Sequence, residues 1–267
     1  MKKIYAVFIS GLSVLAFSSC EGFLDKFPET SLSPETFYTS EKELELATNG
    51  FYTMLPSPDN TTDGALQDND LEYHISLSSL QMGNRSAENE SWSSSTWSNL
   101  RALNYYLEHS VNCTSEDIRK KYDGVAYFFR AMFYYEKVRK YGDIPWYDHV
   151  ISANDKASLY RARDSRGFVM QKIMEDLDKA IDGLPVTWTE GVYRINKYAA
   201  YAFKSRVALF EGTWRKYHDV PDETYTKDDG TQLTLSSEYF LRQSADAAKA
   251  VIDYGKYKMY TGETIVK

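Results

Sequence analysis

The apolar residues between Trp97 and Tyr254 recur every three or four positions, and this helical period most limits how the chain can fold. Residues spaced in this way fall on one side of a helix, which can then be buried against its neighbours. The pattern predicts successive helices over residues 97–112, 115–141, 165–184, 197–216 and 237–254. No segment of strand length shows sustained alternation of apolar and polar residues, so a mainly α-helical protein is predicted.

Capping residues mark several of the helix ends. Ser40 and Glu43 form a capping box at the start of an additional, earlier helix. Asp164 and Asn196 are the predicted N-caps of two later helices, and Gly255 is the predicted residue after the last one.

The order of the helices predicts how they pack. Successive helices joined by loops pack as antiparallel pairs, so the predicted fold class is all-α, with tetratricopeptide-like antiparallel helix pairs and long irregular loops. The strict repeat of tetratricopeptide proteins is absent, so the arrangement is an irregular one. In the last helix, the spacing predicts an inward face made by Leu241, Ala245, Ala248 and Ile252.

A long polar stretch separates the first helix from the others. Pro56 and Pro58 end that helix, and residues 56–96 are rich in Asp, Asn, Ser and Gly. Loops of this length inside a folded domain are usually functional or disordered. Ligand contacts are therefore to be sought here first.

The N-terminus has the layout of a secretory signal peptide. Lys2 and Lys3 precede an apolar segment over residues 4–17, which is shorter than the ~20 residues that a membrane-spanning helix needs. Two serines then precede Cys20, and this arrangement resembles the lipobox of bacterial lipoproteins, in which the cysteine is acylated. The alternative is an ordinary signal peptide cut near Ser19, which would leave a free thiol at Cys20.

The chain is therefore expected to have three parts. Residues 1–19 are the predicted lipoprotein signal peptide, residues 20–39 an extended tether, and residues 40–267 the helical domain. The chain has a net charge of −7 and no block of five or more Lys or Arg residues, which argues against a nucleic-acid partner.

Four segments of the chain form a recognisable series. They are residues 20–25 with Pro28, residues 133–147, residues 163–185, and residues 196–214 together with 245–253. In this order, and with the lipobox, they resemble the SusD/RagB family, the surface lipoproteins with which Bacteroidetes capture nutrients. The resemblance covers the whole chain but only the N-terminal part of the family, so a chain truncated at its C-terminus is expected.

The resemblance implies a function. It implies an outer-membrane lipoprotein, lipid-anchored at Cys20 and facing the exterior, that binds a glycan and passes it to a SusC-like TonB-dependent transporter. No enzyme activity and no cofactor are implied. Three alternatives remain open, which are a RagB-like carrier of peptides, a lipid-anchored glycoside hydrolase with two carboxylates, and a truncated remnant without function.

Candidate ligand contacts lie in and beside the polar stretch. Trp92 has few apolar neighbours in sequence, and an indole ring can stack on the C–H face of a sugar. Asn, Asp and Arg side chains suit sugar hydroxyls, and SusD-like proteins commonly place glycan contacts in this early region. The predicted ligand-binding residues are Trp92, Arg85, Asn84, Asp68, Asp70 and Trp97, although packing is the stronger interpretation for Trp97.

Other chemistry finds little support in the sequence. The oxygen-rich residues 59–70 invite a calcium site, but the twelfth position is Asp70 rather than Glu, so a solvated loop is preferred. The four histidines lack zinc-site spacing, and no GxSxG, CxxC or P-loop motif occurs. Asp143 lies between Gly142 and Pro145, where a turn explains it better than catalysis does.

Overall fold

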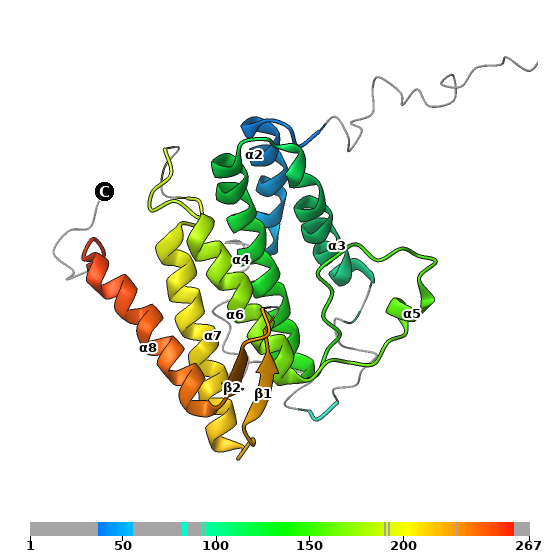
Figure 1. The fold of residues 1–267 in the computed structure, drawn as a ribbon, viewed down its shortest axis with the longest axis vertical. Helices are drawn as coiled ribbons and strands as arrows, with labels where there is room; N and C mark the ends of the chain where they lie inside the picture. The colour runs from blue at the N-terminus through cyan, green and yellow to red at the C-terminus, as the bar shows by residue number, and fades with distance from the viewer. Residues whose placement is uncertain are drawn as a thin grey trace, which may run out of the picture. The chain divides into compact units, whose positions relative to one another are not determined.

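Helices make up most of the described part of the chain (Figure 1). This computed structural model describes residues 37–55, 82–84, 92, 94–189, 191, 193–227 and 229–258. The α-helices are α2 (Glu41–Asn49), α3 (Ser94–His109), α4 (Glu116–Tyr141), α5 (Lys156–Leu159), α6 (Arg166–Gly183), α7 (Lys197–Tyr217) and α8 (Ser237–Tyr254). The 3-10 helices η2 (Gly50–Met54) and η4 (Ser110–Asn112) follow α2 and α3, and the strands β1 (Glu223–Thr226) and β2 (Gln232–Leu235) precede α8. The predicted α-helical fold class is confirmed.

Most of the predicted caps form. The Ser40 side chain accepts from the Glu43 amide, and a Glu43 carboxylate oxygen accepts from the Ser40 amide at 3.0 Å, which completes the capping box. The Asn196 side chain caps α7, and Gly255 ends α8 in the left-handed conformation. The prediction for α6 was wrong by one residue, because the Ser165 hydroxyl is the cap and accepts from the Phe168 amide.

Helix α4 lies at the centre of the fold. It has 26 residues and packs against α2, α3 and α6. In Figure 1, α4, α6, α7 and α8 lie side by side and alternate in direction, as the predicted antiparallel pairs require. No helix in the described residues, α4 included, combines the length and the hydropathy needed to cross a membrane.

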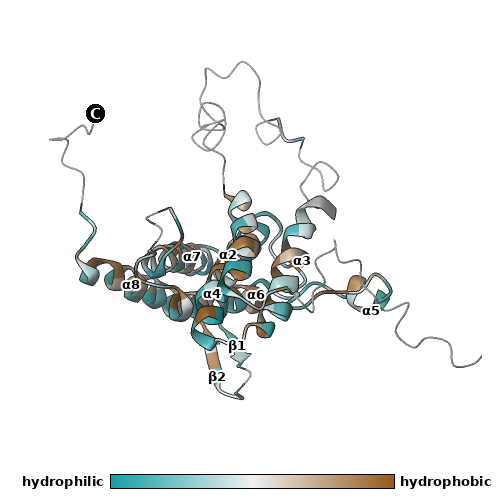
Figure 2. Cartoon of the chain, turned by 90° about the horizontal axis from the view of Figure 1, so that it is seen from above, coloured by the Kyte–Doolittle hydropathy of each residue, from teal (hydrophilic) through white to brown (hydrophobic). Residues whose placement is uncertain are grey.

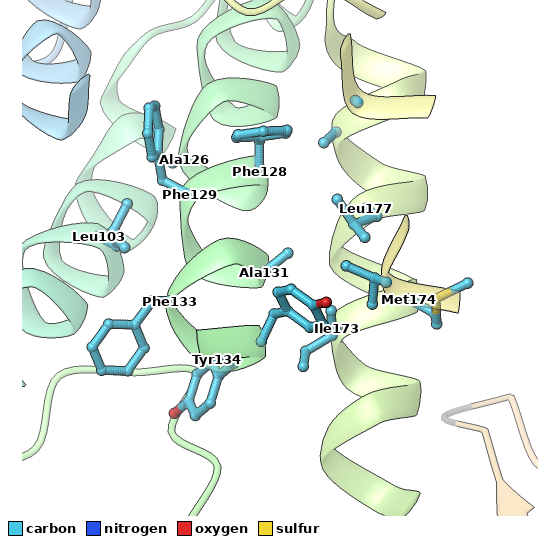
Figure 3. Packing of buried hydrophobic residues seen from close by; sticks show 14 of the residues in the cluster. Leu103, Ala126, Phe128, Phe129, Ala131, Phe133, Tyr134, Ile173, Met174 and Leu177 are labelled. Atoms are coloured by element: carbon cyan, nitrogen blue, oxygen red, sulfur yellow. The ribbon is translucent and has the colours of Figure 1, made fainter. Parts of the chain in front are cut away.

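The core lies on both sides of α4. Figure 3 shows Ile173, Met174 and Leu177 of α6 on one side of that helix and Leu103 of α3 on the other. Each of these side chains is at most 1 % exposed. Burying a large apolar side chain contributes about 1.5–3 kcal/mol, so this packing accounts for much of the stability of the helical layer.

We expect Gly183→Ala to destabilise the protein by about 1–2 kcal/mol, although alanine is the better helix former. A Cβ atom at Gly183 would overlap the backbone carbonyl of Lys120 on α4, because α4 and the end of α6 approach closely there. Chemical denaturation followed by circular dichroism measures the change. Gly50→Ala is the control, since nothing lies within 4 Å of a Cβ atom there, and equal effects of the two changes would contradict the prediction.

The inward face of α8 differs in part from the prediction, although the predicted Leu241 does lie against Gly212 of α7. Ile252 is 75 % exposed and Ala245 is also exposed, whereas Phe240, Ser244 and Ala247 are buried. Hydrophobic and hydrophilic residues alternate along the ribbon of α8 (Figure 2), as in an amphipathic helix. The position of the helix was therefore predicted correctly. Its buried side, however, is centred on Phe240, Ser244 and Ala247, which lie next to the predicted residues on the helix surface.

The hairpin of β1 and β2 was not predicted. The two strands pair antiparallel with Glu223 opposite Leu235, and each has four residues. Arg215 of α7 holds the hairpin, because one guanidinium N–H donates to the Leu235 carbonyl and another to Glu223, both at 2.8 Å. The hairpin is thus stabilised by a contact with a helix in addition to its own strand pairing.

Candidate functional site

A cavity of about 460 Å³ lies between α3 and the segment that follows α4. Among the residues that the structure describes, its walls are formed by Trp92, by residues 97–104 of α3 and by residues 145–159. Cavities of roughly 300–1,000 Å³ are typical of small-molecule sites. The size therefore suits an organic ligand rather than a single ion.

Aromatic rings form one wall of the cavity. Trp92 meets Trp97 edge to face at 4.9 Å between ring centroids, and it meets Tyr141 in the same way at 4.8 Å. Tyr147 lies 6.2 Å from Trp97. Trp92 is nevertheless 40 % exposed. Its ring is therefore held by neighbours and still reaches solvent, as a ring that stacks on a ligand must.

Asn104 of α3 holds the loop segment that lines the cavity. Its buried side-chain N–H groups donate to the carbonyls of Tyr147 and His149, each at 3.0 Å. One turn before Asn104, Arg101 donates to the Ile151 carbonyl at 2.9 Å. One turn after it, a Glu108 oxygen accepts from the Val150 amide at 2.6 Å. These bonds hold residues 147–151 along α3 before any ligand arrives.

A buried ion pair fixes the orientation of Asn104. Arg130 of α4 and Asp176 of α6 form two hydrogen bonds, at 2.7 and 2.8 Å, and their side chains are 5 % and 2 % exposed. A third N–H of Arg130 donates to the Asn104 side-chain oxygen at 3.1 Å. The amide nitrogen of Asn104 therefore points toward the carbonyls at the cavity.

Tyr134 holds the same segment from α4. Its hydroxyl accepts from the Tyr147 amide at 2.6 Å and donates to the Tyr147 carbonyl at 3.2 Å. Burial raises the pKa of Tyr134 well above its ordinary value, so the hydroxyl keeps its proton. The Tyr147 hydroxyl in turn donates to the Ser158 carbonyl at 2.7 Å, which links Tyr147 to the later part of the segment that precedes α6.

The turn that leaves α4 is structural, in agreement with the sequence analysis. Gly142 has a φ of 70° and a ψ of −109°, so it has the positive φ that favours glycine but lies outside the left-handed helical region. Asp143 accepts from the Arg166 amide in the first turn of α6 at 2.8 Å. Asp164 accepts from the Trp146 amide at 2.7 Å, so its side chain faces the loop rather than capping the helix.

The structure brings together some of the predicted ligand-binding residues. Trp92 and Trp97 share the aromatic wall, and Trp97 is partly buried, as the packing interpretation requires. Asn84 is exposed and is not among the residues that line this cavity. The predicted contacts Asp68, Asp70 and Arg85 lie outside the described residues, as do Cys20 and the 59–70 loop.

The sequence analysis missed the polar residues of the cavity. Arg101, Asn104, Tyr147 and His149 line it, although none of them belongs to a spacing pattern that indicates binding. Tyr147 is the last residue of one segment that carried the family resemblance, but only the turn within that segment was interpreted. Distance in sequence hid the others, since Asn104 and Tyr147 are 43 positions apart.

Two carboxylates outside the cavity, Glu211 and Glu223, are engaged by arginines. Glu211 of α7 accepts from Arg166 at 2.8 Å and from Arg215 at 2.9 Å, and Arg215 also bonds Glu223. Burial raises the pKa of Glu211, while the two guanidinium groups oppose that change. This cluster joins α6, α7 and the hairpin, and its bonding partners explain it without catalysis. No group of three or more potential metal ligands occurs among the described residues.

Comparison with known proteins identifies the family. A family model described as starch-binding and associating with the outer membrane matches residues 22–209. The chain belongs to this SusD-like family. The resemblance drawn from the sequence segments is confirmed.

Other SusD-like proteins match most of this chain. SusD-like protein P25 of Formosa agariphila is 25 % identical over 238 residues, which are 80 % of this chain and 44 % of that protein. A crystal structure of a SusD-like protein from Bacteroides fragilis superposes with a TM-score of 0.64 at 23 % identity, over 90 % of this chain and 43 % of that one. A second structure from the same species, of a protein described as carbohydrate binding, gives a TM-score of 0.59 at 16 % identity, over 84 % and 42 %. The fold is thus shared, and this chain spans less than half the length of these relatives.

Proposed function

We propose that this SusD-like protein binds a glycan in the cavity between α3 and residues 145–159, and that it does so without covalent chemistry. The observation that carries the proposal is the exposed ring of Trp92, which is fixed by two aromatic neighbours at the edge of a preformed, mainly apolar cavity that also holds a few polar groups. Sugar rings have an apolar face and a polar edge, and this site offers a partner for each. The family description as starch-binding supports the same ligand class.

The geometry favours reversible binding. Residues 147–151 are already held by Asn104, Tyr134 and Glu108, so little ordering is needed when a ligand binds. The contact area is small, since one ring and a few hydrogen-bonding groups face the ligand. A carrier that must release its cargo needs modest affinity of this kind.

The wider role rests on the sequence and the family together. Acylation at Cys20 would anchor the protein in the outer membrane, and a SusC-like TonB-dependent transporter would receive the glycan. The family is described as associating with the outer membrane, which agrees with this location. A peptide as cargo and hydrolysis of a glycan are the alternatives that the experiment below must separate.

We expect Trp92→Ala to weaken glycan affinity about tenfold, which corresponds to ~1.4 kcal/mol, because the stacking partner is lost. The measurement is calorimetric titration of the detergent-solubilised full chain against a panel of glycans and peptides, with product release followed in parallel. Tyr217→Ala is the matched control, since Tyr217 is 76 % exposed and does not line the cavity. Binding of peptides alone, or release of reducing sugar, would contradict the proposal, and so would unchanged glycan affinity in Trp92→Ala.

A further inference from the structure

In the described part of the chain, the permanently charged side chain that lines the cavity is an arginine, although the chain as a whole is acidic. The chain has 38 Asp and Glu residues against 31 Lys and Arg. Among the described residues that line the cavity there is no carboxylate, and Arg101 carries the permanent charge. The charge of the lining residues is therefore opposite in sign to that of the whole chain, and composition does not account for it.

Two further arginines lie over the aromatic walls. The guanidinium carbon of Arg163 lies 5.8 Å from the centre of the Trp92 ring, and that of Arg161 lies 5.7 Å from the centre of the Tyr147 ring. Arg161 is bound to the Trp146 carbonyl and to Asp164. Arg163 is exposed and forms no ion pair with a described residue. Its guanidinium is thus available beside the ring on which a sugar would stack.

The carboxylates near the cavity are already engaged. Glu108 accepts from the Val150 amide, Asp164 from the Trp146 amide and Arg161, and Asp155 from the Ser158 amide. Asp148 pairs with His149 at 3.0 Å. Arg101 uses one N–H for the Ile151 carbonyl, and a guanidinium has five N–H donors. Hydrogen bonds from neutral amides leave these carboxylates charged, so the positive charge is local to Arg101 and Arg163 and is not a net charge of the whole region.

We propose that the ligand of this cavity is an anionic glycan, whose carboxylate or sulfate group pairs with Arg163 while its ring stacks on Trp92. The proposal rests on the proposed function and narrows its ligand class. Planar guanidinium groups match carboxylate and sulfate oxygens with two parallel hydrogen bonds. Arg101 of α3 also lines the cavity and adds attraction for an anionic group.

The test uses two matched pairs of glycans with the detergent-solubilised full chain. Polygalacturonate and its fully methyl-esterified form differ in carboxylate charge, and carrageenan and agarose compare a sulfated galactan with a neutral one. We expect at least tenfold tighter binding of the acidic member of one pair, which also identifies the anionic group. The preference should weaken several-fold as NaCl is raised from 50 to 300 mM, because exposed charges are screened.

Arg163→Ala should reduce affinity for the acidic glycan about tenfold and leave the neutral one unchanged, whereas Arg163→Lys should retain part of the preference. Arg206→Ala is the control, an exposed arginine of α7 that does not line the cavity. Equal affinity for acidic and neutral glycans, with loss of both in Trp92→Ala, would overturn this inference and leave the proposed function standing. If neither Trp92→Ala nor Arg163→Ala changed the affinity for the acidic glycan, that glycan would be adsorbed elsewhere on the protein. This result would overturn the inference as well. Binding of no glycan would overturn both proposals.

Discussion

Asp176→Ala is expected to lower the free energy of unfolding by about 3–5 kcal/mol, the largest effect of any single change considered for this protein. The substitution leaves the Arg130 guanidinium buried without its counter-ion, in a position where both side chains are at most 5 % exposed. It also removes two short hydrogen bonds between α4 and α6. Urea denaturation followed by circular dichroism measures the loss directly.

Two variants serve as controls for this prediction. Glu238→Ala removes an exposed ion pair with Arg242 on α8 and should change stability by less than ~0.5 kcal/mol. The double variant Arg130→Met with Asp176→Leu should recover most of the loss, because no uncompensated charge stays buried. A loss below ~1 kcal/mol in Asp176→Ala would show that water or a rearranged side chain solvates Arg130.

Raising the pH from about 4 to about 7 is expected to destabilise the protein through Asp123. Burial on α4 raises the pKa of this carboxyl from its ordinary 3.8 to about 6, and nearby Ser110, Arg119 and Tyr106 offset the effect only in part. One carboxylate oxygen is buried and accepts no hydrogen bond from a described residue. Ionising this group inside the protein is therefore unfavourable.

The sign follows from proton binding. A carboxyl with a raised folded-state pKa binds its proton more tightly when folded, so its contribution to stability is present below pH ~4 and is lost as the pH rises through ~6. The total is about 3 kcal/mol for a shift of roughly two pKa units. Asp123→Asn keeps the shape and removes the charge, so it should be more stable than the wild type at pH 7.5 by an amount of this order.

The comparison between wild type and Asp123→Asn isolates this group from other titrations. Their unfolding free energies should converge at pH 4, where Asp123 is protonated in both the folded and much of the unfolded state. The buried Tyr106 hydroxyl has a pKa raised by burial, so it stays neutral throughout this range. A stability difference that does not vary with pH would show that Asp123 is not the titrating group.

Local sequence signals predicted the helices well. The period of apolar residues located α3, α4, α6, α7 and α8, because each helix buries one side and the spacing along one turn records this. Ser40 and Asn196 were identifiable as caps because their short polar side chains are of the type that caps helices. In the structure each accepts from an amide three residues ahead. Asp164 was mistaken for a cap because two adjacent residues, Asp164 and Ser165, can both perform that role.

Contacts between distant segments decided what local signals could not. The periodicity of α8 fits two neighbouring faces, and Phe240 and Ala247 are buried because α7 lies against them. The strands of the hairpin have four residues each, so their alternation is a short signal that is easily overlooked, and the Arg215 contacts that hold them come from another element.

The cavity also combines residues that local sequence signals indicate with residues that only contacts between distant segments bring together. Trp92 could be singled out from the sequence, because an indole in a polar stretch has no local packing reason to be there. Arg101, Asn104, Tyr147 and Arg163 could not, because the packing of α4 between α3 and α6 is what brings their segments to one cavity. The sequence by itself determined the helical class and the family, and of its six ligand-contact candidates Trp92 and Trp97 line the cavity. These inferences depend on residues close in the chain or on a series of segments. Only the tertiary structure decided which faces are buried and which charges meet at Trp92, since both depend on groups that are distant in the chain and adjacent in space.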